Sequence, residues 1–142
     1  MAGCGGGDGI SDDAVFTAYV EAPLCAEAER ELAQRGAGVE HFRVRIACLP
    51  RTQKNKFFDL SQIGSNARRA TEDSSSIAYV AEPGKGANAF SLPILEEADI
   101  PQLTATSGAT AISRLLLAIE EAGDAGSLRE AVSEALDKGL SR

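Results

Sequence analysis

Two short turns carry the residues best suited to binding a small charged ligand. The first, residues 84–86 (Gly-Lys-Gly), follows the apolar run 77–80 and precedes apolar residues at helical spacing. Backbone N–H groups at the start of a helix bind anions such as carboxylates. The second turn carries the hydroxyl groups of Thr104, Thr106 and Ser107. Ordinary loop chemistry explains either turn about as well as ligand binding does.

Three cysteines are the other candidates for chemistry. Cys25 follows the apolar run 15–20, and Cys48 lies near the end of the apolar run 42–49. If these runs are adjacent parallel strands, both residues lie at one edge of the sheet. A disulfide is then feasible if the two Cα atoms lie within about 7 Å, and two separate buried thiols are the alternative. The sequence has no CxxC motif or other metal-ligand spacing, so it predicts neither a metal site nor a cofactor.

Arrangements of residues typical of catalysis are scarce. His41 is the single histidine and lies in a polar segment, which is typical of an exposed loop residue. Glu96 and Glu97 are adjacent on an expected helix and face different directions, so they do not form a carboxylate pair. Neither a GxGxxG fingerprint nor a Walker-type phosphate loop is present. The sequence therefore predicts a protein that is not an enzyme, with a Rossmann-like enzyme as an alternative.

Composition limits the classes of partner. The 142 residues suffice for one globular domain, with 44% hydrophobic and 25% charged residues. The net charge of −7 argues against nucleic acid and anionic membrane surfaces, because both reward clustered Lys and Arg. The aromatic content of 5% argues against a stacking platform for bases. No apolar run approaches membrane-spanning length.

The first 13 residues, MAGCGGGDGISDD, are small, flexible and acidic, and they predict a tether. Met-Ala-Gly-Cys resembles the end of a bacterial lipobox, which implies a lipidated Cys4 and an extracytoplasmic domain anchored to a membrane. The basic and apolar segments of a signal peptide do not precede it. A cytoplasmic protein is the alternative if Met1 is the genuine start. The lipid anchor is the only membrane contact that the sequence predicts.

Residues 14–142 alternate apolar runs of strand length with apolar stripes at helical spacing. This alternation predicts a single three-layer α/β/α domain with a mostly parallel sheet of about four strands. The basic segment 51–58 is interpreted as a solvated loop, with an anion contact or a partner surface as the alternative. Strands are expected over residues 15–20, 42–49, 77–80 and 100–106, and helices over residues 24–35, 59–73, 87–98, 112–122 and 128–140.

One segment also resembles a known family. Residues 76–110 read as strand, small-residue turn, helix, strand and hydroxyl-rich turn. This order resembles that of type I periplasmic binding proteins, the branched-chain amino acid receptor group, and the resemblance extends loosely over residues 15–110. Asp99 stands where the family usually has glycine. The matching residues are Pro93, Ile94, Glu96, Glu97, Ala98, Ile100 and Pro101.

This resemblance implies one lobe of a two-lobed receptor that feeds an ABC transporter. In the family, the first turn binds the ligand carboxylate through a Ser hydroxyl and backbone amides, and Lys85 stands about where that Ser would be. The second turn receives the ligand ammonium. The implied ligand-binding residues are Pro23, Leu24, Gly84, Lys85, Gly86, Thr104, Thr106 and Ser107.

We therefore expect a shortened solute-binding domain that binds an amino acid or another small anion weakly. A transporter permease is one expected partner, and a second lobe supplied by dimerisation is another. The alternative function is a structural or protein-interaction domain that keeps the lobe fold and binds no ligand.

Overall fold

The computed structural model describes residues 14–35, 38–39, 42–54, 57–122, 132 and 134. Within these residues the main sheet has five strands in the order β2-β3-β1-β6-β7, and only β2 pairs in antiparallel fashion. The predicted α/β fold with a mostly parallel sheet of about four strands is therefore confirmed. The strands are β1 (Ala14–Glu21), β2 (Gly38–Val39), β3 (Phe42–Leu49), β6 (Ser76–Ala81) and β7 (Gln102–Thr104).

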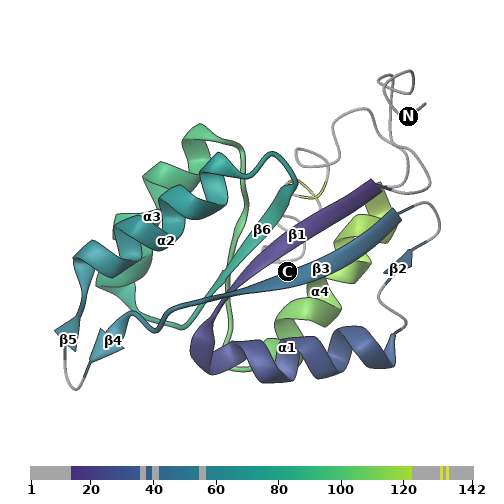
Figure 1. Cartoon of the computed structure of the whole chain (residues 1–142), viewed down its shortest axis with the longest axis horizontal. Helices are drawn as coiled ribbons and strands as arrows, with labels where there is room; N and C mark the ends of the chain where they lie inside the picture. Colours follow the sequence, from purple (N-terminus) through teal and green to yellow (C-terminus); the bar gives the residue numbers. More distant parts are fainter. Residues whose placement is uncertain are drawn as a thin grey trace.

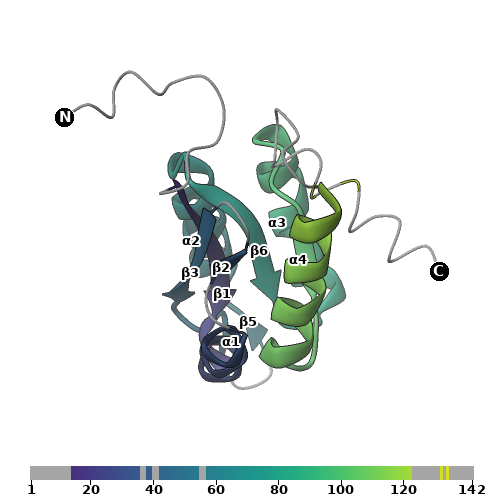
Figure 2. The same cartoon turned by 90° about the vertical axis from the view of Figure 1, so that its right-hand side faces the viewer.

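Helices cover both faces of the sheet, in pairs (Figures 1 and 2). One pair, α1 and α4, packs together on one face, and the other pair, α2 and α3, packs together on the opposite face. Among the described helices, none is long and apolar enough to cross a bilayer. The helices are α1 (Ala22–Gln34), α2 (Leu60–Glu72), α3 (Lys85–Glu97) and α4 (Gly108–Ala122).

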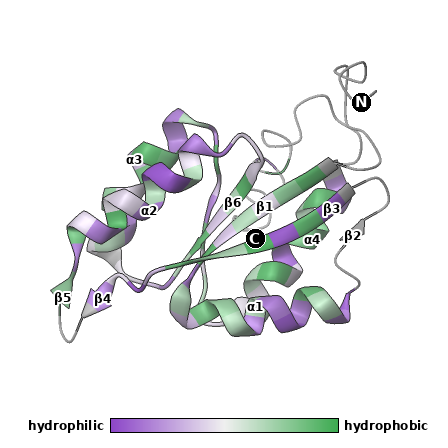
Figure 3. Ribbon diagram, in the orientation of Figure 1, coloured by the Kyte–Doolittle hydropathy of each residue, from purple (hydrophilic) through white to green (hydrophobic). Residues whose placement is uncertain are grey.

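Two apolar cores follow from the alternation of side chains along the strands. Ala18 and Val20 of β1 point toward α1 and α4, whereas Tyr19 points toward α2 and α3. Strand β6 is buried along its whole length, as expected of a strand covered on both faces. Figure 3 shows the apolar colour along β1 and β6 and hydrophilic segments on β3, which carries the exposed Arg43 and Arg45. Strand β3 is therefore only partly covered.

The order of the strands creates a topological switch point between β1 and β6. From β1 the chain passes through α1 to β3 on one side, and from β3 it passes through α2 to β6 on the other side. Helices that follow the two neighbouring strands, α1 and α3, consequently lie on opposite faces of the sheet. In open α/β sheets, ligands bind beyond the carboxyl ends of the strands at such a point.

The segment 51–58 differs from the solvated loop expected for it. Strands β4 (Gln53–Lys54) and β5 (Phe57–Phe58) form a small antiparallel hairpin there. Phe58 accounts for part of the difference, because its ring lies against Gly84 in the turn after β6, whereas Phe57 is exposed. Charge and polarity dominated the sequence interpretation, and the two phenylalanines at the end of the segment were the missed signal.

Strand β7 is also shorter than the expected segment 100–106, because Ile100 closes the end of α3. Its N–H donates to the carbonyl of Leu95, and the N–H of Asp99 donates to that of Glu96. Asp99 has a φ of 58°, in the left-handed region that favours glycine. Cys4, His41 and most of the expected helix 128–140 lie outside the described residues.

Candidate functional site

A buried carboxylate stands at the switch point. Glu21 ends β1, directly after an apolar run, and its side chain is only 4% exposed. One carboxylate oxygen accepts the backbone N–H of Glu82, which follows β6, at 2.8 Å. The other accepts the hydroxyl of Tyr79, on β6, at 3.3 Å. Glu21 therefore joins the carboxyl ends of the two strands between which the switch point lies.

Two further buried polar side chains extend this network toward β3. Thr52, in the segment after β3, is buried and lies near the Glu21 carboxylate. Asn66 of α2 donates to the carbonyl of Pro50 at 3.0 Å and lies near the Tyr79 hydroxyl. The carboxyl ends of β1, β3 and β6 are thus held together by side chains rather than by the sheet alone. This support is the kind that keeps loops at a ligand site in one conformation.

Burial controls the protonation of this network. Loss of solvation raises the pKa of Glu21 above its ordinary value, and the hydrogen bonds from Glu82 and Tyr79 oppose the rise only in part. Tyr79 likewise has a raised pKa, first because of burial and then because of the nearby Glu21 carboxylate. Such a carboxyl costs stability when it ionises, and groups of this kind are concentrated at functional sites.

We expect Glu21→Gln to make the free energy of unfolding less dependent on pH between pH 4.5 and neutral pH, even though the amide keeps only one of the two oxygens that accept hydrogen bonds. The native pKa of Glu21 lies above the unfolded value of 4.5, so the native state binds the extra proton. The free energy of unfolding then falls as the pH rises from 4.5 through the native pKa. The glutamine side chain of Glu21→Gln does not ionise, so this fall is absent from the variant. Urea denaturation of both proteins between pH 4 and pH 8 measures the difference.

The control for this measurement is Glu72→Gln, on the exposed side of α2, which should keep the wild-type slope. Asp73, whose pKa is lowered chiefly by the hydrogen bond from Tyr19, changes stability near pH 4 in the opposite direction, but it does so equally in wild type and variants and cancels from the difference. Equal pH slopes in wild type and Glu21→Gln would show that the carboxyl is not strained by burial.

The side chain of Asn88 stabilises the turn between β6 and α3. This side chain accepts the N–H of Gly84 at 3.1 Å and donates to the carbonyl of Glu82 at 3.2 Å. The N-cap residue of α3 is Gly84, which has no side chain to accept the first N–H groups of the helix. A Cβ built on Gly86, in the first turn, meets nothing within 4 Å, so the chain is open at this residue, whereas the ring of Phe58 lies against Gly84. Uncapped N–H groups at an accessible helix start attract anions.

The turn between β7 and α4 presents hydroxyl groups of two kinds. Ser107 caps α4, because its Oγ accepts the N–H of Thr110 at 3.3 Å and its carbonyl accepts that of Ala111. Thr104 and Thr106 are exposed. The strand ends of β6 and β7 are in register at residues 81 and 104, so this turn lies beside the start of α3. The fold thus brings two of the predicted ligand segments to one edge.

Pro23 and Leu24, which were also predicted to bind the ligand, contribute less to this edge than expected. Leu24 is buried in the core between α1 and α4, so its side chain does not face the edge. Pro23 is half-buried in the first turn of α1.

The Glu21 network is not predicted from the sequence, although two signals for it are present. A glutamate directly follows the apolar strand, and Asn66 interrupts the apolar stripe Ile63, Ala67 and Ala70 of α2.

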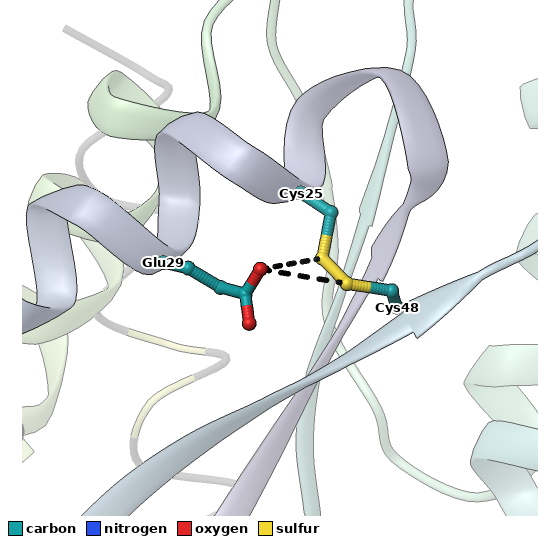
Figure 4. The surroundings of a disulfide bond; sticks show 3 residues. All are labelled: Cys25, Glu29 and Cys48. Atoms are coloured by element: carbon teal, nitrogen blue, oxygen red, sulfur yellow. Dashed lines mark hydrogen bonds between the residues drawn. A yellow bond between two sulfur atoms is a disulfide. The ribbon is translucent and has the colours of Figure 1, made fainter.

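A disulfide lies at the same edge of the sheet, near the end of β3. Cys25, in the first turns of α1, is bonded to Cys48 near the end of β3, with the Cα atoms 5.8 Å apart (Figure 4). Strands β1 and β3 are adjacent and parallel, which is the arrangement that a bridge between these positions requires. The bridge fixes the start of α1 to β3, one strand away from the switch point.

No protein-family profile, curated protein or solved structure matches the chain. The relation to periplasmic binding proteins therefore rests on the residues quoted for it and stays a prediction.

Proposed function

We propose that this chain is a solute-binding domain that holds a small carboxylate, with a free amino acid as the first candidate. The observation that carries the proposal is the uncapped start of α3, which lies directly after the switch point. Glu21 holds the backbone of this turn in place through the N–H of Glu82. The exposed hydroxyls of Thr104 and Thr106 are suited to a ligand ammonium.

Binding to this single edge should be weak. Small-molecule sites usually bury about 70–90% of their ligand, and one edge of a sheet covers a ligand from one side only. We expect a dissociation constant in the millimolar range for the monomer, about −4 kcal/mol. A second lobe from a dimer or another protein, such as a transporter component, would tighten it. Extracytoplasmic location and lipidation of Cys4 belong to the same proposal.

The test is an NMR titration of the monomeric protein with L-leucine and, separately, with acetate. Both probes should shift the amide signals of residues 84–87, and only L-leucine should also shift those of residues 104–107. Gly86→Asp places a fixed carboxylate at the start of α3 and should abolish the shifts, whereas Gly86→Asn should keep them. Shifts confined to other parts of the chain, or an affinity of micromolar or tighter in the monomer, would contradict the proposal.

A protein-interaction domain is the second candidate, because apolar side chains are exposed beside this edge. Phe57, on the β4–β5 hairpin, is 76% exposed, and Leu60, at the start of α2, is 52% exposed. Aromatic residues in such positions are typical of protein contacts. If Phe57→Ser abolishes capture of a partner and neither probe shifts the two turns, the interaction function is the correct one.

A further inference from the structure

The disulfide has a carboxylate beside both sulfur atoms. One oxygen of Glu29 lies 3.8 Å from the Sγ of Cys25 and 3.9 Å from the Sγ of Cys48 (Figure 4). Glu29 follows Cys25 by one turn of α1, so the two side chains share a face of the helix. The three ligand atoms lie within 4.8 Å of one another. Spacing along the chain does not predict this cluster, because Cys48 comes from β3.

These distances suit a tetrahedral thiolate site. Zn²⁺ binds cysteine sulfur at about 2.3 Å and carboxylate oxygen at about 2.1 Å, so a tetrahedral site separates sulfur from oxygen by about 3.6 Å. The Glu29 oxygen already lies near that separation from both sulfurs. After reduction the sulfurs must move to about 3.8 Å apart, and Cys48 is exposed and has room to turn.

The charge around the sulfurs favours a metal over a reactive dithiol. Reactive thiols have a thiolate stabilised by neighbouring cations or by a helix N-terminus. Cys25 lies near the N-terminus of α1, but the Glu29 carboxylate faces both sulfurs and disfavours two further negative charges. A divalent cation reverses this effect, because it neutralises the carboxylate and both thiolates at once.

We propose that the reduced protein binds a thiophilic divalent cation, first of all Zn²⁺, through Cys25, Cys48 and Glu29. Glu29 and Cys48 are exposed, so a water molecule can complete the fourth position. The bound ion replaces the covalent link between α1 and β3 with a metal-held one. This site is independent of the proposed solute edge, since it uses none of the residues of the two turns.

Reduction must precede metal binding. A water-soluble phosphine gives two electrons to the S–S bond, takes the oxygen of a water molecule and becomes a phosphine oxide. The two protons of that water go to the two sulfurs. Zn²⁺ then displaces both thiol protons into the solvent as two Zn–S bonds form.

The experiment uses the full chain with Cys4→Ser, which removes the third thiol and keeps the site. The protein is reduced with the phosphine, freed of it without oxygen, and titrated with Co²⁺ as a coloured substitute for Zn²⁺. One equivalent should give thiolate-to-cobalt charge-transfer bands, which Zn²⁺ should remove. The oxidised protein should give none. Missing bands in the reduced protein, or equal bands in the oxidised protein, would overturn the proposal.

Two matched variants test the carboxylate. Glu29→Gln should weaken Zn²⁺ binding at least about tenfold, measured by competition with a chromophoric chelator. Glu31→Gln removes an equal charge from the same helix and should leave the affinity unchanged, because the Glu31 carboxylate pairs with Arg35 at 2.6 Å. Unchanged affinity in Glu29→Gln would remove this residue from the site.

Circular dichroism is recorded with each titration to follow the fold. If reduction unfolds the chain, Zn²⁺ should restore the fold, and failure to do so would also overturn the proposal.

Discussion

Gly108→Ala should destabilise the protein by about 3 kcal/mol and lower its melting temperature by about 10 °C. A Cβ built on Gly108 lies 2.0 Å from the carbonyl oxygen of Leu24 and 2.8 Å from the backbone nitrogen of Ala28. Both contacts are with the backbone of α1, which cannot turn aside as a side chain can. The methyl group therefore has to push α4 away from α1, and thermal unfolding followed by circular dichroism measures the cost.

The matched control is Gly86→Ala, also in the first turn of a helix. A Cβ there meets nothing within 4 Å, so alanine should be neutral or should stabilise by up to about 1 kcal/mol. Equal effects of the two substitutions would mean that helices α1 and α4 do not approach each other as closely as the structure has them. The Glu27 carboxylate, which accepts the N–H of Gly108 at 3.0 Å, should lose that bond in Gly108→Ala.

Removing the Cys25–Cys48 bridge should cost about 3 kcal/mol, the second large effect. The cysteines are 23 residues apart, and a closed loop of that length restricts the unfolded chain by about this amount. Urea denaturation of the double variant Cys25→Ala, Cys48→Ala measures the loss.

Mass spectrometry of the non-reduced protein, after digestion, should recover the peptides of Cys25 and Cys48 joined to each other. Cys4→Ser should leave both this cross-link and the denaturation midpoint unchanged. Two freely alkylated thiols in folded, oxidised protein would contradict the bridge, and an unchanged midpoint in the double variant would contradict its contribution to stability.

The elements with strong periodicity could be predicted from the sequence, because local patterns decide them. Strand 42–49 matches its expected bounds, and α2 begins after Asp59, whose side chain accepts the N–H of Gln62 as an N-cap should. Strands β1 and β3 are adjacent and parallel, which the sequence offered only as the condition for the disulfide. The β4–β5 hairpin was not predicted, although Phe57 and Phe58 were a signal for it in the sequence.

The candidate site was predicted in outline and missed at its centre. Gly84 and Thr106 lie at the expected edge, since the carboxyl ends of parallel strands meet there. The role of Glu21 depends on the N–H of Glu82, 61 positions along the chain, and no local pattern encodes that contact. For the same reason the cluster of Cys25, Glu29 and Cys48 becomes visible only once α1 and β3 are placed together.

The central place of β1 also sets an order for folding during synthesis. Strand β1 leaves the ribosome first, yet one of its two neighbours in the sheet is β6, which ends at Ala81. At about 5–20 residues per second, the apolar run of β1 waits several seconds with one hydrogen-bonding edge unpaired. An unpaired apolar strand is a template for aggregation. The nascent chain should therefore need protection by a chaperone until β6 has emerged and filled that edge.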